Sequence, residues 1–291
     1  AVDYETLEVL TESGIEFTIL APWQVDRPDG EIASPFRVEL KNGKSIIVFI
    51  FNRNLSTSIS FNPAATVNAD VFMHQCILPQ FERNGQQFLM IATDGELYGH
   101  HQPFREKFLH YLMTKSAAEA GISTTYPALW LKQHPVEETT RIIENTSWSC
   151  LHGVERWRGE CGCSSSAGWK RPLREALDYL SLRVDTEYEA TCRSVGIDPW
   201  YLRDDYVRVF LGDIPFDLWI NEKLQVKADL SNNEKIHKLL SAEYECQRMF
   251  NSCAWFFDDL ERIEPKNSII YAAHAAWLTK EATGIDLSEK M

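Results

Sequence analysis

The stretch Ile46-Ile47-Val48-Phe49-Ile50-Phe51 decides the fold class of this chain. An unbroken run of β-branched and aromatic residues favours a strand that is buried on both faces, as in parallel sheets covered by helices. Glu16–Leu20 and Phe88–Thr93 are two further apolar runs of strand length. Strands that alternate with helices are typical of a parallel sheet or barrel. We therefore predict three adjacent parallel strands within an α/β domain over residues 1–115.

Two local signals refine this first domain. Asp3 is placed to cap a helix before the first strand, and Gly14 is placed to end it. Phe36–Leu40 alternates apolar and polar residues, and the turn at residues 41–44 joins it to the next strand. An alternating run, a turn with Asn and Gly, and a second run predict a β-hairpin.

The second half of the chain has a helical pattern. Apolar residues recur every three or four positions in Arg171–Gly196, and Glu234–Leu260 and Asn267–Thr283 show the same period. We predict an all-α domain over residues 116–291 that packs against the first. The fold class is thus α/β followed by all-α.

Composition indicates which binding partners and which cellular compartment to expect. The formal net charge is −13 and the pI is about 5.1, so the surface should repel nucleic acid and anionic membranes. No apolar run reaches the length of ~18 residues that a spanning helix needs. Seven cysteines, an odd number in a long chain, argue against a disulfide-stapled secreted domain and favour a cytoplasmic protein. No phosphate-binding or dinucleotide motif is found, and no cofactor is predicted.

The segment Ile91–Phe104 holds the strongest chemical signal. An apolar strand runs into Asp94 and Glu96 and then into His100 and His101. Active sites of parallel α/β folds lie where strands end. A carboxyl group at the mouth of an apolar strand can be partly desolvated, and desolvation favours the protonated form that a general acid needs. Asp94 is the candidate catalytic acid.

The string Thr93-Asp94-Gly95-Glu96-Leu97-Tyr98-Gly99-His100-His101 resembles the fourth signature region of glycoside hydrolase family 57. The block from Thr146 to Cys163 is similar to a family branch that carries a domain of unknown function numbered 3536, and the resemblance covers essentially the whole chain. It implies the C-terminal part of an incomplete seven-stranded (β/α) barrel packed against a helical domain. It also implies a retaining enzyme that acts on an α-glucan-like polysaccharide or oligosaccharide, of amylase, glucanotransferase or branching type.

The same resemblance implies roles for individual residues. Asp94 takes the place of the general acid/base, while Glu96, His100 and His101 line the sugar site. Asn251–Asp258 is similar to the family's fifth region, which puts Trp255 over the barrel mouth. The nucleophile of the family is a Glu that ends the fourth strand, and here it would lie upstream of Ala1. We therefore expect the missing N-terminal half of the barrel as a partner and no full activity from this chain alone.

Residues after the first two strands point to the same site. Trp23 and Gln24 follow the first strand and Arg53 follows the second, and the carboxyl ends of parallel strands meet at one edge. The guanidinium of Arg53 could bind a sugar hydroxyl or a carboxylate, and a surface ion pair is the alternative. All three are predicted to bind substrate.

The region that precedes the long helix is rich in Trp, Cys and His. Trp148 is predicted to be an aromatic platform for a sugar ring, with the neighbouring His152 in the same substrate site. Cys150, Cys161 and Cys163 could hold zinc or a cluster with His152, but C-x-C spacing is less usual for zinc. The spacing favours thiols that shape a Gly-rich loop, and no metal ligand is assigned.

Two other functions remain open on these residues. A metal-dependent carbohydrate deacetylase could use Asp94 with His100 or His101 as ligands, although Arg105 stands where a second His one turn later is expected. A non-catalytic module that binds glucan through its helical half is the other alternative.

Overall fold

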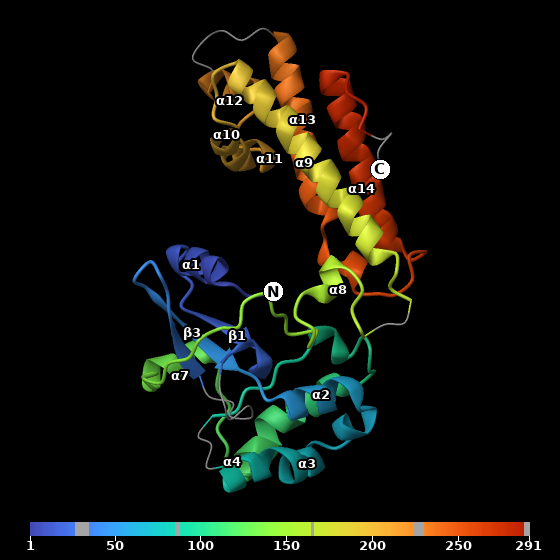
Figure 1. The fold of residues 1–291 in the computed structure, drawn as a ribbon. Helices are drawn as coiled ribbons and strands as arrows, with labels where there is room; N and C mark the ends of the chain where they lie inside the picture. The colour runs from blue at the N-terminus through green and yellow to red at the C-terminus, as the bar shows by residue number, and fades with distance from the viewer. Residues whose placement is uncertain (27–34, 85–87, 164–165, 224–229, 288–291) are drawn as a thin grey trace. The chain divides into compact units, whose positions relative to one another are not determined.

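The computed structural model describes residues 1–26, 35–84, 88–163, 166–223 and 230–287 of the 291-residue chain. The chain divides into two compact units, Ala1–Val154 and Glu155–Met291 (Figure 1). The first unit holds the strands and the second is helical, which agrees with an α/β region followed by a helical one. The division lies later in the chain than the boundary near residue 115 that the sequence suggested.

A three-stranded sheet of order β1-β3-β2 forms the centre of the first unit. β1 (Phe17–Leu20) runs parallel to β3 (Ser45–Ile50), as predicted, and β2 (Pro35–Glu39) pairs antiparallel with β3 in the predicted hairpin. Val48 of β3 lies opposite Thr18 on one side and Phe36 on the other. Val48 and Phe36 are fully buried, so the central strand carries the core of this unit.

The third predicted strand, Phe88–Thr93, is not a strand in the structure. β1 and β2 occupy both edges of β3, so the segment has no free strand edge there to pair with. It is held by isolated hydrogen bonds instead: the backbone N of Asn52 donates to Met90 O at 2.7 Å, and Ala92 N donates to Ser56 Oγ at 3.1 Å. The segment therefore still passes the carboxyl end of β3.

Helices surround the sheet and build a second apolar cluster (Figure 1). The first helix has the predicted ends, because Asp3 Oδ1 accepts from Thr6 N at 2.7 Å and Gly14 has a φ of +80°. The helical segments of this unit are α1 (Tyr4–Glu12), η1 (Pro22–Gln24), α2 (Arg53–Phe61), η2 (Pro63–Thr66), α3 (Ala69–Phe72), η3 (Met73–Ile77), α4 (Leu78–Asn84), η4 (Gly95–Leu97), α5 (Arg105–Tyr111), η5 (Leu112–Ser116), α6 (Ala117–Glu119) and α7 (Pro127–Gln133), of which η3 and η5 are π-helical.

The first unit extends beyond residue 115 because the chain after α7 returns to the sheet. Backbone bridges join Thr139 to Arg37, Ile142 to Val25 and Thr146 to Val2. These bridges are long-range in sequence and leave no local periodicity, so the pattern of apolar residues did not reveal them.

The second unit is built on three long helices. α9 (Lys170–Ser194) and α14 (Ile263–Thr283) confirm the predicted periodicity, whereas α13 (Leu230–Met249) ends about three turns before the predicted Leu260. Asn251 stops it, since its side chain accepts from Ala254 N at 3.3 Å and begins a new turn. The shorter helical segments are α8 (Glu155–Arg158), α10 (Pro199–Asp205), α11 (Val207–Phe210), α12 (Phe216–Lys223) and η6 (Ser252–Trp255).

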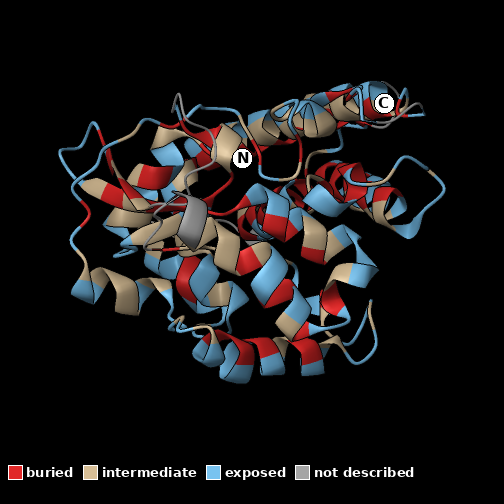
Figure 2. Cartoon of the chain, turned by 90° about the horizontal axis from the view of Figure 1, so that it is seen from below, coloured by how far each residue is buried: buried red, intermediate tan, exposed pale blue. Residues whose placement is uncertain are grey.

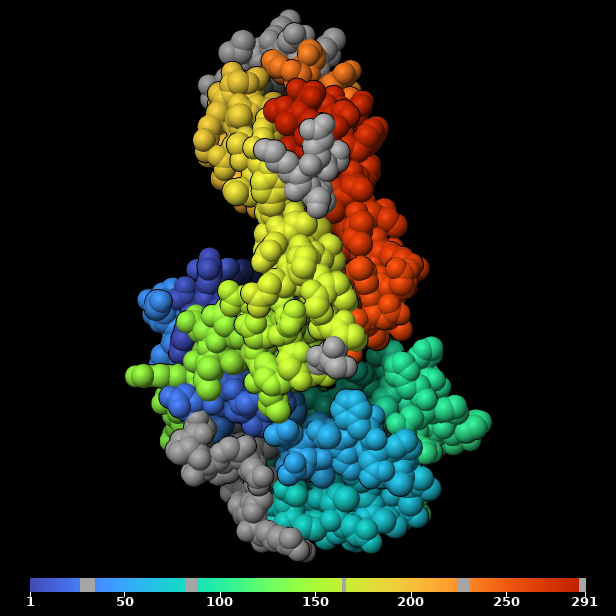
Figure 3. All heavy atoms as spheres, turned by 45° about the vertical axis from the view of Figure 1, so that its right-hand side comes forward, coloured from blue at the N-terminus to red at the C-terminus, as the bar shows by residue number. Residues whose placement is uncertain are grey.

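The three long helices bury one face each. Leu177, Leu180 and Val184 of α9 meet Ala272 and Ala275 of α14 in one apolar cluster, and Figure 3 shows α9 in yellow running along the red-orange α14. Figure 2 shows buried and exposed residues alternating along the helices, as amphipathic helices require.

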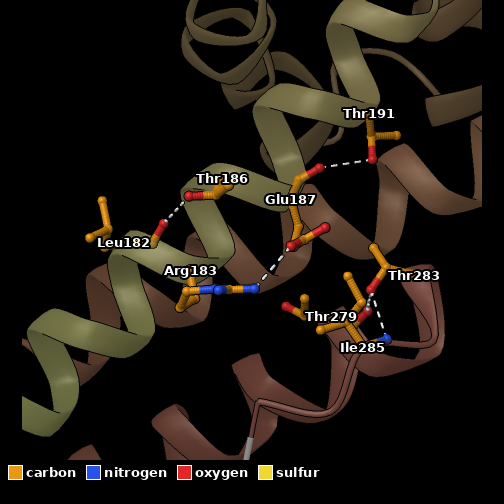
Figure 4. A network of polar contacts seen from close by, with 8 residues as sticks. All are labelled: Leu182, Arg183, Thr186, Glu187, Thr191, Thr279, Thr283 and Ile285. Carbon is orange, nitrogen blue, oxygen red and sulfur yellow. Dashed lines mark hydrogen bonds and ion pairs between the residues drawn. The ribbon is translucent and has the colours of Figure 1, made fainter.

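Some polar side chains outside that core bind within their own helix or just beyond its end (Figure 4). Arg183 pairs with Glu187 at 3.4 Å on α9, and Thr283 Oγ1 of α14 donates to Thr279 O at 2.8 Å. Ile285 N donates to Thr283 Oγ1 at 3.2 Å just after the helix ends. In the described residues, no helix has both the length and the apolar composition to cross a membrane.

Candidate functional site

A compact turn presents the candidate acid. Asp94 begins η4, where Asp94 O accepts from Leu97 N at 3.3 Å. Leu97 is buried in the helical cluster of the first unit, and the hydroxyls of Thr93 and Tyr98 lie 3.1 Å apart. The turn is thus anchored by one apolar side chain and one polar contact, while the Asp94 carboxyl makes no capping hydrogen bond with this turn.

The other residues of the motif lie on the same turn. Glu96 O accepts from His100 N at 3.2 Å and from His101 N at 2.9 Å, and the two imidazole rings are 4.9 Å apart between centroids. Gly99 makes this tight reversal possible with a φ of +118°. The structure therefore brings together the four residues that the motif predicted: Asp94, Glu96, His100 and His101.

Those four side chains are all exposed. The sequence predicts a partly desolvated carboxyl at Asp94, but within the described residues nothing buries it. The apolar run before it is not a strand covered on both faces, so its end does not form an apolar mouth. Any desolvation of Asp94 has to come from a group that binds over this turn.

Trp23 and Arg53, both predicted at strand ends, lie in contact with each other. The Arg53 guanidinium lies over the Trp23 ring at 5.4 Å, and Trp23 also meets Phe51 edge to face at 6.1 Å. Arg53 is exposed and opens α2. The segment that leads to Asp94 bonds to the same region through Ser56, so Trp23, Arg53 and the Asp94 turn share the carboxyl end of β3.

Gln24, by contrast, has a structural role. It is 3% exposed, its Oε1 accepts from Ala21 N at 3.0 Å, and its Nε2 donates to Thr146 O at 3.3 Å. Both ends of the amide are used by backbone groups, so the prediction that Gln24 contacts substrate was wrong.

Trp255 is also part of a core and not of an open cleft. Its side chain is fully buried in the main apolar cluster of the helical unit, with Trp169 stacked on it at 6.1 Å. Lys170 Nζ donates to Trp255 O at 2.8 Å. A ring with no exposed surface cannot hold a sugar, so the assignment of Trp255 as a substrate residue was wrong.

Trp148 and His152 are both exposed. Trp148 keeps 56% of its surface accessible, as a sugar platform requires. His152 Nδ1 lies 3.8 Å from Cys150 Sγ.

Comparison with known proteins decides the family. Residues 1–143 match the model of "Glycosyl hydrolase family 57", and residues 166–291 match "Domain of unknown function (DUF3536)". The chain is a glycosyl hydrolase family 57-like protein. A search of curated protein sequences gave no match.

Solved structures share the fold of this family 57-like protein. The exo-type maltose-forming amylase of Pyrococcus sp. ST04 matches with a TM-score of 0.71 at 15% identity, over 100% of this chain and 55% of the amylase. The GH57-type branching enzyme of Pyrococcus horikoshii matches with a TM-score of 0.51 at 15% identity, over 95% of this chain and 50% of that enzyme. The GH57 branching enzyme of Thermococcus kodakaraensis matches with a TM-score of 0.52 at 15% identity, over 94% of this chain and 52% of that enzyme.

The family 57-like chain thus spans about half the length of the solved structures it matches. The family whose model matches residues 1–143 is one of glycosyl hydrolases. The resemblance that the Asp94 motif carried is therefore confirmed at the level of the family.

A deacetylase-type metal site is not supported by the geometry. Among the described residues, the group of His, Cys, Asp or Glu side chains close enough to hold an ion is Cys150, His152, Cys161 and Cys163. Asp94, His100 and His101 do not form such a group in the part of the chain that the structure describes.

Two hollows in the described part of the first unit lie away from the Asp94 turn. One of about 500 Å³ opens at the amino ends of the parallel strands, beside Glu16 and Ser45. Another of about 520 Å³ lies between Asn68 and Phe104. Neither is lined by Asp94, whose side chain is exposed.

Proposed function

We propose that this protein is a retaining enzyme acting on an α-glucan, as hydrolase or glycosyl transferase, with Asp94 as general acid/base. The observation that carries this proposal is the Asp94 turn, which presents two acids and two imidazoles together at the carboxyl end of β3. The solved structures with the same fold are named as an amylase and as branching enzymes, which supports an α-glucan as substrate.

The mechanism needs two carboxyl groups. Asp94 donates a proton to the glycosidic oxygen while a second carboxylate attacks the anomeric carbon and forms a covalent glycosyl-enzyme. Asp94 then takes a proton from water or from a sugar hydroxyl, which attacks the same carbon and releases the second carboxylate. The two carboxyl groups of a retaining enzyme stand about 5–5.5 Å apart.

We propose that the second carboxylate is a Glu from a strand upstream of Ala1, as the family resemblance implies. The proposal is consistent with a chain that spans about half of the matched structures. The same upstream part would lie over the exposed Asp94 turn and supply its desolvation, so this chain by itself should not complete the reaction.

The remaining proposed substrate contacts are made by side chains that can reach a sugar at this end of the sheet. Glu96, His100 and His101 are free of the core and can donate to or accept from sugar hydroxyls. The Trp23 ring, with Arg53 over it, offers an apolar face and a fork of donors at the same end of the strands.

The test uses the full-length protein and an α-glucan. Asp94→Asn keeps the size of the side chain but removes its acid function, so turnover should fall by about 10²–10⁴-fold with little change in KM. Asp213→Asn is the matched control, because Asp213 is an exposed aspartate of the helical unit. Unchanged turnover of Asp94→Asn would contradict the assignment, and inactivation of the wild type by a chelator with loss of a metal at Asp94 would favour a deacetylase.

A further inference from the structure

Four potential metal ligands gather in one short continuous stretch of chain. The Sγ atoms of Cys150, Cys161 and Cys163 and an imidazole nitrogen of His152 all lie within 4.8 Å of one another. Cys150 and Cys161 are buried, whereas His152 and Cys163 are exposed. The stretch lies between the two regions that match family models, residues 1–143 and 166–291, so neither region accounts for it.

The distances suit a single tetrahedral ion. Bonds of about 2.3 Å to sulfur and 2.0–2.1 Å to nitrogen place tetrahedral ligand atoms about 3.5–3.8 Å apart. Cys150 Sγ and His152 Nδ1 are already 3.8 Å apart, and the upper limit for the group is 4.8 Å. Closing the group on an ion therefore takes an inward movement of about 1 Å or less by any ligand atom.

A disulfide would explain less of this arrangement. It would join two of the thiols at about 2.05 Å and would leave the convergence of a third thiol and an imidazole without a reason. Three sulfurs and one ring nitrogen are, in contrast, an established ligand set of structural zinc.

The Cys150–His152 half is held by a tight loop. Ser147 Oγ donates to Gly153 O at 2.8 Å and to Cys150 O at 3.4 Å, and Gly153 has a φ of +72°. Ser147 O in turn accepts from Trp23 Nε1 at 2.8 Å. These bonds fix the backbone around the first two ligands independently of any ion.

The Cys161–Cys163 half follows a helix that is also fixed. Gly159 N donates to Glu155 O at 2.9 Å at the end of α8, and Arg174 Nη1 donates to Trp157 O at 3.1 Å. Both pairs of ligands thus leave anchored backbone, and an anchored scaffold is what selects one geometry for an ion.

We propose that Cys150, His152, Cys161 and Cys163 bind one zinc ion as a structural Cys₃His centre. Binding releases the three thiol protons to solvent and leaves a centre of net charge −1, made of Zn²⁺, three thiolates and a neutral imidazole. Four protein ligands leave no position for water or substrate, so the ion stabilises the stretch and does not take part in the chemistry of Asp94.

The first test measures metal content. Full-length protein, purified without a metal-binding tag, should contain about one zinc per chain by mass spectrometry, a stoichiometry that one four-ligand site sets. Cys161→Ser and Cys163→Ser should each lose most of it. The control Cys253→Ser removes another exposed cysteine outside the group and should keep it. Zinc retained at full stoichiometry in both ligand variants, or absent from the wild type after growth in zinc, would overturn the proposal.

The second test does not depend on whether the variants fold well. Zinc is removed from the wild type with a chelator and Co²⁺ alone is added. Visible d–d and thiolate charge-transfer bands of tetrahedral Co²⁺ are expected, and zinc should abolish them. Weak octahedral bands, or iron with acid-labile sulfide in the protein as isolated, would instead show that the group does not hold a mononuclear zinc-type ion.

Discussion

A buried carboxyl group in the helical unit should make the stability of that unit depend on pH. Glu243 of α13 is 2% exposed, and burial, together with the neighbouring Asp185, raises the pKa of its carboxyl from 4.5 to about 8. At neutral pH the group is therefore mostly protonated and can donate to Asp185. Its contact with Arg203 at 3.2 Å is then a hydrogen bond to a neutral acid more than an ion pair.

The size of the effect follows from the displacement of the pKa. The pKa of Glu243 rises by about 3.5, from 4.5 to about 8. A rise of this size corresponds to roughly 4–5 kcal/mol of unfolding free energy. Since the proton is shared with Asp185, we expect on the order of 3 kcal/mol for Glu243 itself. The contribution is complete below pH 4.5, falls as the unfolded chain releases the proton, and is lost once pH passes about 8.

Glu243→Gln keeps a donor for Asp185 and an acceptor for Arg203 but cannot titrate. The free energy of unfolding of the wild type should fall as pH rises from 5 to 8.5. For the variant this fall should be smaller by on the order of 3 kcal/mol. The assay is urea unfolding of the full-length protein, read by pulse-labelling hydrogen exchange on peptides from α13. Glu234→Gln, an exposed change on the same helix, is the control and should follow the wild type. Parallel pH profiles for all three proteins would refute the reasoning.

Three further predictions test the packing, the loop and the substrate contact. Leu180→Ala removes a fully buried side chain of α9 and should cost about 2–5 kcal/mol of unfolding free energy in urea, whereas Leu182→Ala, at a site 64% exposed, should cost less than ~0.5 kcal/mol. Gly153→Ala should lower the melting temperature more than Gly14→Ala. Both glycines have positive φ, but a Cβ at Gly153 would meet a backbone oxygen at 2.8 Å, whereas a Cβ at Gly14 would meet no atom within 4 Å. Equal changes in melting temperature for the two variants would argue against a strained loop. Trp148→Ala should raise KM for the glucan and leave the melting temperature unchanged, because the ring is exposed; an unchanged KM would remove Trp148 from the substrate site.

The sequence predicted the elements whose causes are local. α1 begins at a side chain that accepts from Thr6 N and ends before a glycine in the left-handed region, and both signals are visible without the fold. α9 and α14 follow from a sustained helical period. The run from Ile46 to Phe51 predicted β3 because strands buried on both faces are apolar throughout.

The sequence did not predict features that depend on competition between distant segments. Phe88–Thr93 has the composition of a strand, but β2 takes the edge of β3 at which it would pair. Gln24 was assigned to substrate by its position after the first strand and Trp255 by its position in a motif, and only the packing of the folded chain shows that both are buried. The cysteines have an unusual spacing for zinc, and only the folded chain shows that three of them and His152 lie within 4.8 Å of one another.

The most direct test of the central claim is the configuration of the product that azide forms with Asp94→Asn in the full-length protein. With an α-glycosyl substrate that carries an activated leaving group, the glycosyl-enzyme should accumulate, because no general base activates water. Azide needs no such base, so it should restore turnover and give a glycosyl azide with the α configuration of the substrate. A β-glycosyl azide would make Asp94 the nucleophile, and undiminished turnover without azide would remove Asp94 from the mechanism.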